Sequence, residues 1–253
     1  MNVGRTVRAS SLLLTGLLIT ACSGGASSDS AASQVITVSA AASLTDAFTE
    51  IGTAYSASHP DVDVRFNFGG SSTLAEQINA GAPVDVFAAA SDRAMRTTLE
   101  AGTVGSPAIF TRNSMAIAVP VGNPADITSL DGLANPDVTV VVCDEPAPCG
   151  SAARAIFDAS GLTVTPASLE PDVRAVLTKV ISDEADAGIV YRSDISAAGD
   201  TVESIDIPDS VNAVNEYPIA ATTDAAPQAQ DFIDFVLSDA GQSILTRWGF
   251  TSR

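Results

Sequence analysis

The chain has 253 residues, of which 46% are hydrophobic, so it can form one large domain or two smaller ones with well-buried cores. Its formal net charge is −18, which argues against nucleic acid and against anionic membrane surfaces as partners. An anionic ligand would also be repelled at long range, so a site for such a ligand would have to act through local dipoles and the exclusion of water.

The first 21 residues predict a secretory signal peptide. Arg5 and Arg8 precede an apolar run at 11–20 that is too short to cross a membrane as a helix. The segment ends in Ile-Thr-Ala-Cys and resembles a bacterial lipobox, in which Cys22 is lipidated and becomes the mature N-terminus. The alternative is a soluble secreted protein in which Cys22 has no such role. Residues 22–34, rich in glycine, alanine and serine, predict a flexible tether.

Strand and helix patterns alternate along the rest of the chain, which favours an α/β fold with a parallel sheet covered on both faces. Beyond a first strand that ends near residue 42, strand patterns cover 62–68, 84–89, 115–120, 138–142, 187–191 and 216–222. Helical spacing covers 45–58, 92–100 and 229–248, and further helices are expected after the turns at 69–73 and 143–151 and from Pro171.

The stretch Val-Ser-Ala-Ala-Ala-Ser-Leu at 38–44 predicts a strand-to-helix turn built from small residues. Ser43 suits the N-cap position of the following helix, and the unpaired N–H groups of a first helical turn attract anions. Ser43 is therefore a candidate ligand contact. The alternative is that it only caps its own helix, which is the commoner role of a serine at such a position.

Three more segments predict a helix start with unpaired N–H groups. Gly-Gly-Ser-Ser-Thr at 69–73 supplies Ser71, and residues 143–151 follow another apolar strand. Pro171 suits the first position of a helix, which leaves the N–H of Val173 among the unpaired donors of the first turn.

None of these turns carries Lys or Arg, a pattern that suits a small oxyanion held by neutral donors in a closed site. An oxyanion that carries a proton would leave that proton unpaired, at a cost of about 1–3 kcal/mol. Hydrogenphosphate is therefore expected to bind poorly.

Cys143 and Cys149 lie close together in a chain that we expect to be exported, and they predict a disulfide. A loop this short would contribute roughly 2 kcal/mol and would stiffen the segment between the cysteines. A metal site is the alternative, but no histidine or further cysteine stands nearby to complete it.

Four motifs resemble those of the periplasmic molybdate-binding proteins of ABC transporters, and the likeness extends over about residues 35–250. The motifs are Ala-Ala-Ala-Ser-Leu-Thr-Asp-Ala at 40–47, Gly-Ser-Ser-Thr-Leu-Ala at 70–75, Ala-Gly-Ala-Pro-Val-Asp-Val-Phe at 80–87 and Gly-Ile-Val-Tyr at 188–191. The resemblance implies a two-lobed periplasmic-binding-protein fold, in which each lobe is a mostly parallel sheet flanked by helices and two crossing strands join the lobes. We expect lobe 1 to comprise 35–114 and 218–253, and lobe 2 to comprise 115–217.

Carried onto this sequence, the resemblance implies ligand contacts from the hydroxyl and N–H groups of Ser43 and Ser71, the N–H groups of Cys149 and Val173, and the Tyr191 hydroxyl. Cys149 departs from the pattern, because alanine or another small residue is expected there, but a backbone donor tolerates the change. The implied function is the binding of molybdate, and of tungstate, for delivery to a membrane ABC permease. No cofactor or catalytic residue is implied, and we expect a monomer at the extracytoplasmic face of a bacterial cell membrane, held there only by the lipid anchor at Cys22.

Two alternatives stay open from the sequence: a receptor for sulfate or another small ligand, and an extracytoplasmic enzyme that acts on a small anion. Nucleophilic catalysis would lack its usual base, because His59 is the only histidine and is expected to be solvated at a helix end. Arg174 follows Val173 directly, and we expect it on a helix surface, paired with an acid across the cleft between the lobes.

Overall fold

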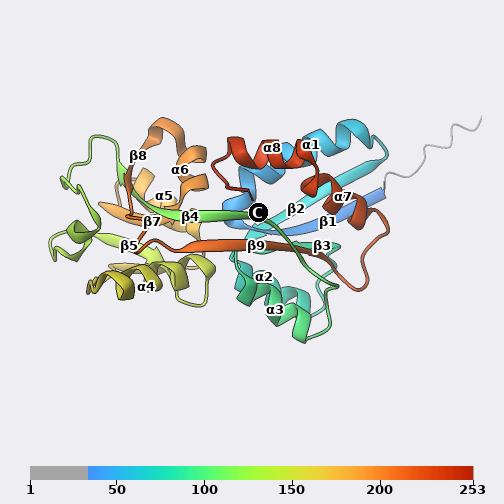
Figure 1. Ribbon diagram of the computed structural model, residues 1–253, viewed down its shortest axis with the longest axis horizontal. Helices are drawn as coiled ribbons and strands as arrows, with labels where there is room; N and C mark the ends of the chain where they lie inside the picture. The colour runs from blue at the N-terminus through green and yellow to red at the C-terminus, as the bar shows by residue number, and fades with distance from the viewer. Residues whose placement is uncertain (1–33, 253) are drawn as a thin grey trace, which may run out of the picture. The chain divides into compact units, whose positions relative to one another are not determined.

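The computed structural model describes residues 34–252, in which strands and helices alternate along the chain (Figure 1). The strands are β1 (Gln34–Ala41), β2 (Val62–Gly69), β3 (Val86–Ala88), β4 (Ala108–Pro120), β5 (Val140–Cys143), β6 (Ser168–Glu170), β7 (Ala187–Tyr191), β8 (Val202–Asp206) and β9 (Val214–Ala221). The helices are α1 (Thr45–Ser58), α2 (Ser71–Asn79), α3 (Asp92–Glu100), α4 (Pro148–Ser160), α5 (Val173–Ile181), α6 (Arg192–Ala198), α7 (Gln228–Leu237) and α8 (Asp239–Arg247).

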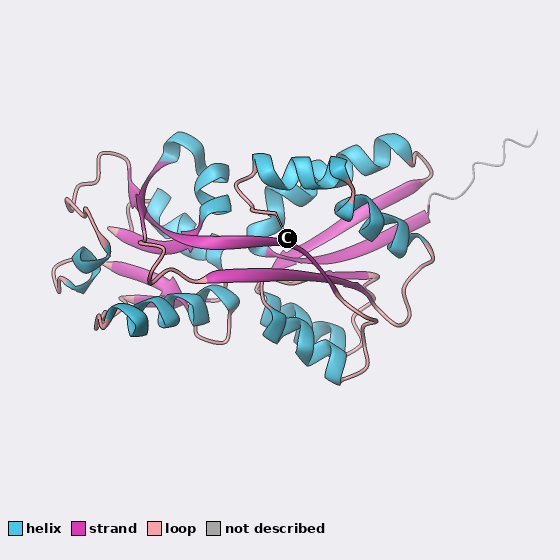
Figure 2. Cartoon of the chain, in the orientation of Figure 1, coloured by secondary structure: helices cyan, strands magenta, loops and turns pink. Residues whose placement is uncertain are grey.

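The strands pair in the order β2-β1-β3-β9-β4-β7-β5-β6, with β8 added alongside β4. Strand β1 runs parallel to β2 and β3, and β5 runs parallel to β6 and β7. Strands β9 and β4 are antiparallel to their neighbours. Helices lie on both faces of the sheet (Figure 2). The predicted α/β class is confirmed, and the sheet is mixed: four of its eight strand pairs are parallel and four are antiparallel.

Strands β4 and β9 connect two halves of this sheet. We call β1–β3 with α1–α3, α7 and α8 the first half, and β5–β8 with α4–α6 the second half. The beginning of β4 pairs with β9 as far as Ser114, opposite Val214, and from Met115 onward β4 pairs with β7 and β8. The structure thus has the two crossing strands that the sequence predicts, while the lobe boundaries at 114 and 217 stay a prediction.

Successive side chains along a strand point to opposite faces of the sheet, and this divides the core of the first half into two clusters. Val86 and Ala88 belong to a cluster with residues of α1, α7 and α8, whereas Phe87 and Ala89 pack with α2 and α3 on the other face. The second half has one cluster, built from residues between 115 and 207. Ala42, from the turn after β1, also packs into that cluster and so joins the two halves.

Several helix boundaries differ from the predictions: α2 and α4, for example, begin at Ser71 and Pro148, within the turns that were expected to precede them. Ser43 does not cap α1, because it lies in a 3-10 turn, Ala42–Leu44, and the N-cap of α1 is Leu44. Helix α5 begins at Val173 rather than at Pro171, because the Asp172 side chain accepts the N–H groups of the next two residues after Val173 and so caps the helix.

The predicted single helix at 229–248 is two helices, α7 and α8, that break at Ser238. The Ser238 hydroxyl accepts the N–H of Gly241 and so begins a new helix. A Cβ on Gly241 would lie 2.4 Å from the carbonyl oxygen of Val236, so only glycine allows the two helices to meet this closely. By contrast α1, α3 and β7 have the predicted bounds.

The signal peptide, the tether and Cys22 lie outside the described residues. Among the helices of residues 34–252, none combines the length and the apolar character that crossing a membrane requires.

Candidate functional site

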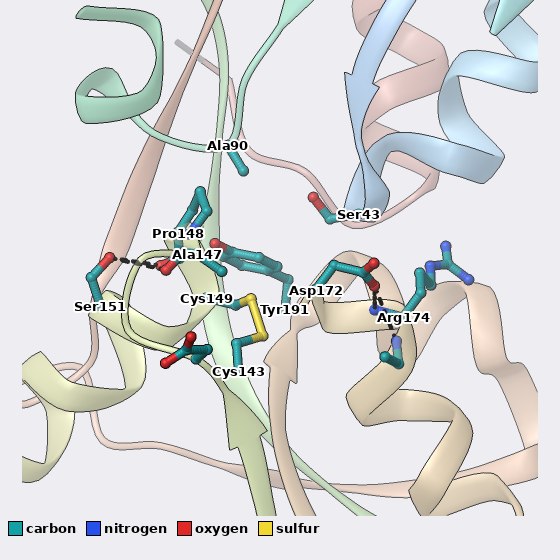
Figure 3. The surroundings of a disulfide bond; sticks show 12 residues. Ser43, Ala90, Cys143, Ala147, Pro148, Cys149, Ser151, Asp172, Arg174 and Tyr191 are labelled. Carbon is teal, nitrogen blue, oxygen red and sulfur yellow. Dashed lines mark hydrogen bonds between the residues drawn. A yellow bond between two sulfur atoms is a disulfide. The ribbon is translucent and has the colours of Figure 1, made fainter. Parts of the chain in front are cut away.

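A small pocket lies between the two halves of the structure. The first half contributes Ala41, Ala42, Ser43, Gly69, Gly70, Ser71 and Ala90, and the second half contributes Ala147, Pro148, Cys149, Asp172, Val173 and Tyr191. All five residues predicted as ligand contacts therefore line one pocket, although they come from five separate segments of the chain. Figure 3 shows Ser43 and Ala90 on one side, with Ala147, Pro148, Cys149 and Tyr191 facing them.

Helix starts bring backbone donors to this pocket. Ser71 is the first residue of α2, Val173 is the first residue of α5, and Cys149 is the second residue of α4. Ser43 lies in the 3-10 turn that leads into α1. Within residues 34–252, no hydrogen bond uses the backbone N–H of Ser43, Ser71, Cys149 or Val173. These groups are the unpaired donors that every helix start leaves, and here they are buried at one point.

Three hydroxyl groups line the same pocket, and each has a hydrogen-bond partner in the surrounding protein. The Ser43 hydroxyl lies 2.9 Å from the Tyr217 hydroxyl. The Ser71 hydroxyl accepts the N–H of Ala90 at 3.0 Å. The Tyr191 hydroxyl lies at 2.9 Å from the side-chain amide nitrogen of Asn215, which donates to it. The Ser71 hydroxyl thus bonds to a residue of the pocket lining and the Ser43 hydroxyl to a residue behind it, and neither serine caps its helix.

The disulfide between Cys143 and Cys149 is present and confirms the prediction; it joins the end of β5 to the first turn of α4 (Figure 3). The turn between them is tightly packed, because a Cβ on Gly150 would lie 2.0 Å from the carbonyl oxygen of Asp144. The disulfide and this glycine together fix the turn that presents the Cys149 N–H to the pocket.

Beside the pocket, Arg174 forms an ion pair with Asp46 on α1, which joins the two halves as the sequence predicts. Its Nε atom also lies 3.1 Å from Oδ1 of Asp194, although the two groups are not aligned for a hydrogen bond. Asp194 is fully buried and accepts the backbone N–H of Tyr191. Burial raises the pKa of Asp194 to about 7, and the Arg174 guanidinium opposes this rise.

The two halves also touch on the side of α2. The Ser72 hydroxyl donates to the carbonyl oxygen of Pro146. A Cβ on Gly70 would lie 2.6 Å from the carbonyl oxygen of Pro171, so glycine is needed for the halves to come this close. Contacts between the halves therefore surround the pocket.

His59 is not part of the pocket. It ends α1, where its ring stacks on Tyr55 with the ring centroids 4.0 Å apart. Among the described residues that line the pocket, Asp172 alone carries a carboxylate, and its Oδ1 atom accepts the N–H groups of Arg174 and Ala175.

Sequence reasoning missed the partners of the hydroxyls. The sequence predicts Tyr217 only as part of the strand at 216–222, and it predicts no role for Asn215. The pattern of β9 carries no signal for either contact, because Tyr217 meets a residue that is 174 positions away in the sequence.

The chain is similar in sequence to a family of known proteins. The family model described as "Bacterial extracellular solute-binding protein" matches residues 36–251. The chain is 42% identical over 247 residues to the "Molybdate-binding protein ModA" of Mycobacterium tuberculosis, and the match covers 95% of each protein.

Two solved structures are similar over most of the chain. The substrate binding domain of a putative molybdenum ABC transporter from Clostridium difficile has a TM-score of 0.66 and 25% identity, and the match covers 87% of this chain and 100% of that one. The periplasmic molybdate-binding protein of Azotobacter vinelandii has a TM-score of 0.76 and 17% identity, and the match covers 86% of this chain and 99% of that one. These likenesses confirm the two-lobed fold. Below, the first half is named lobe 1 and the second half lobe 2, while the predicted bounds of the lobes stay a prediction. The chain belongs to the bacterial extracellular solute-binding protein family.

Proposed function

We propose that this protein binds molybdate outside the cytoplasm and delivers it to a membrane ABC permease. The observation that carries the proposal is the convergence of four unpaired N–H groups and three hydroxyls on one pocket between the lobes. The ligand is assigned by the similarity to proteins named as molybdate-binding. The proposed contacts are Ser43, Ser71, Cys149, Val173 and Tyr191.

A dianion among these groups would be stabilised by local dipoles. The first turns of α2, α4 and α5 lie at the pocket, and each helix start carries partial positive charge. In a water-excluding pocket such dipoles act through a low effective dielectric, whereas the net charge of −18 acts mainly through screened solvent. Affinity would therefore come from the pocket itself.

Lobe closure is the proposed mechanism. Ser43 and Ser71 belong to lobe 1, and Cys149, Val173 and Tyr191 belong to lobe 2, so a ligand that touches all five stabilises the closed form. The ion pair between Asp46 and Arg174 and the Ser72–Pro146 hydrogen bond also join the lobes, and they would add to the stability of the closed form.

Tungstate has the shape and charge of molybdate, and we propose that it binds as well. A receptor for sulfate or another small ligand is the second candidate, because the same donors suit any tetrahedral dianion. An enzymatic role is disfavoured, since the residues that line the pocket include no histidine or lysine to act as a base beside Ser43. We therefore propose binding without catalysis and without a cofactor.

The family description as extracellular agrees with export. We propose in addition that residues 1–21 are removed, that Cys22 carries the lipid anchor, that 22–34 act as a tether, and that the mature protein is a monomer. No other contact with the membrane is proposed.

An anion series tests the ligand. A ligand at one hundred times its dissociation constant should raise the free energy of unfolding by about 2.7 kcal/mol. We expect molybdate and tungstate to raise the melting temperature at low concentration, sulfate to act only at much higher concentration, and phosphate to have no effect, as measured by thermal unfolding. Equal shifts with sulfate and molybdate would favour the sulfate receptor, and no shift with any anion would refute the proposal.

The serine contacts are tested by Ser43→Ala and Ser71→Ala. Each removes one hydrogen bond to a charged ligand, worth about 1.5–3 kcal/mol, so each should weaken molybdate binding roughly 10- to 100-fold in calorimetric titration. Ser39→Ala is the matched control, because Ser39 is also buried but lies outside the pocket lining. If both pocket variants bind as tightly as the control, these serines are not ligand contacts.

The buried carboxyl group of Asp194 predicts a dependence of stability on pH. Its pKa is raised from 3.8 to about 7 in the folded protein, so the folded state binds more protons than the unfolded state between these values. Stability should therefore fall as the pH rises through this window, by at most about 1.4 kcal/mol per pH unit from this group.

Asp194→Asn removes this titration while keeping an oxygen that can accept the Tyr191 N–H. We expect the variant to gain stability relative to the wild type as the pH rises from about 4 to about 7, as measured by denaturant unfolding across that range. A difference between the two proteins that does not change with pH would contradict the prediction.

The lipid anchor is tested by Cys22→Ala. The wild type should incorporate a labelled fatty acid and sediment with membranes, and the variant should do neither. Ser23→Ala serves as the control and should behave like the wild type. A wild-type protein without label would show that the chain is exported without an anchor at Cys22.

A further inference from the structure

A hydroxyl group has one hydrogen to donate and lone pairs with which to accept. The three hydroxyls of the pocket can therefore each give a hydrogen to an anion only if they accept, rather than donate, in their contact with the protein. The direction of each protein contact decides what kind of ligand the pocket can hold.

For Ser71 the direction is fixed by chemistry. Its partner at 3.0 Å is the backbone N–H of Ala90, which can only donate. The Ser71 hydroxyl accepts that hydrogen, and its own hydrogen is left for a ligand.

For Tyr191 the direction follows from the orientation of the Asn215 side chain. The amide nitrogen of Asn215 lies 2.8 Å from the carbonyl oxygen of Ala90 and 2.9 Å from the Tyr191 hydroxyl. A carbonyl oxygen can only accept, so the NH2 group, and not the amide oxygen, must face Ala90. A third contact, to the carbonyl oxygen of Pro148, is longer at 3.5 Å. The second hydrogen of the NH2 group then points to Tyr191, which accepts it and keeps its own hydrogen for a ligand.

For Ser43 the partner is the Tyr217 hydroxyl at 2.9 Å, and either oxygen could donate. Tyr217 is fully buried, and burial raises its pKa far above the ordinary value, so it keeps its hydrogen throughout the physiological range. When an anion lies against Ser43, the only hydrogen of Ser43 is drawn to the charge, because hydrogen bonds to ionised acceptors are the stronger ones. The hydrogen between the two hydroxyls must then come from Tyr217.

Asp172 is the one carboxylate among the described residues that line the pocket, and it could in principle accept a hydrogen from a ligand. Its Oδ1 atom instead accepts the N–H groups of Arg174 and Ala175 at 2.9 and 3.1 Å. Figure 3 shows its carboxylate directed to the start of α5 by these two bonds. No hydrogen bond within residues 34–252 uses Oδ2, so it is the direction of this carboxylate, toward the helix start, that turns it from a ligand; the other polar side chains of the pocket lining are the three hydroxyls.

We propose that Tyr217 and Asn215 are positioning residues that hold the Ser43 and Tyr191 hydroxyls as donors, so that the pocket selects oxyanions carrying no proton. This inference rests on the proposed function, since it assumes that the pocket holds a tetrahedral oxyanion. Without Tyr217 the Ser43 hydroxyl can turn and accept a hydrogen from a protonated anion, and without the Asn215 amide the Tyr191 hydroxyl can do the same.

The test compares sulfate with phosphate as competitors of molybdate at mildly alkaline pH, where phosphate is HPO4²⁻. The two anions are alike in size and in charge, and they differ in the proton. The proteins are the wild type, Tyr217→Phe, Asn215→Leu and the control Tyr55→Phe, which removes a buried tyrosine hydroxyl that has no hydrogen-bond partner in the described structure.

We expect Tyr217→Phe and Asn215→Leu each to weaken molybdate binding about 10-fold and to narrow the preference for sulfate over hydrogenphosphate by about the same factor. Tyr55→Phe should leave both quantities unchanged. Thermal unfolding in the absence of ligand checks that each variant is folded. If Tyr217→Phe does not fold, the result for Asn215→Leu alone tests the inference.

Equal weakening for all anions, with the preference unchanged, would show a merely structural role and overturn the inference. Wild-type affinity and preference in both variants would overturn it as well. A wild type that binds sulfate but not molybdate would refute the proposed function, while the preference would still decide the roles of Tyr217 and Asn215. If the wild type binds no oxyanion, both proposals fall.

Discussion

Unpaired backbone N–H groups at helix starts are the constraint on which the site depends. Such groups are costly to bury, yet those of Ser71, Cys149 and Val173 are enclosed between the lobes. Closure without an acceptor would leave these donors unsatisfied, whereas in an open form water can pair with them. An anion therefore does more than add contacts, because it removes the penalty that closure would otherwise incur. Ligand binding and lobe closure are coupled by the same hydrogen bonds.

The charged side chains near the pocket join the lobes and do not contact the ligand in the proposed arrangement. Arg174 lies beside Val173, but its guanidinium is engaged by Asp46 of lobe 1 and lies against Asp194 of lobe 2. It thus links the lobes next to the pocket, and recognition is left to neutral groups. Neutral donors distinguish ligands by the number and direction of hydrogen bonds, while a cation would attract any anion of the same charge.

The sequence predicted features that depend on local chemistry. Helices α1 and α3 and strand β7 have the predicted bounds because their apolar spacing and end residues determine them. The break at Ser238 was missed, since it needs the close approach of Gly241 to the end of α7, which is a packing event. The contact of Ser43 with Tyr217 joins positions 174 residues apart, and no local pattern encodes it. The five pocket residues came from the family resemblance together with the helix-start argument.

Cys149 shows what such a site leaves free to vary. The proposed contact at this position is the backbone N–H, which any residue except proline supplies, so the side chain is available for another purpose. Here it forms the disulfide with Cys143, which fixes the turn carrying that N–H. The same holds for Val173: its side chain packs in the core of lobe 2, while the proposed ligand contact is its backbone N–H. Ser43, Ser71 and Tyr191 have no such freedom, because in each the proposed contact is the side-chain hydroxyl. The partner of Ser71 is the backbone N–H of Ala90 in the pocket lining, whereas the partners of Ser43 and Tyr191 are the side chains of Tyr217 and Asn215, which lie outside the lining. The constraint on sequence therefore extends one layer beyond the pocket wall at Tyr217 and Asn215.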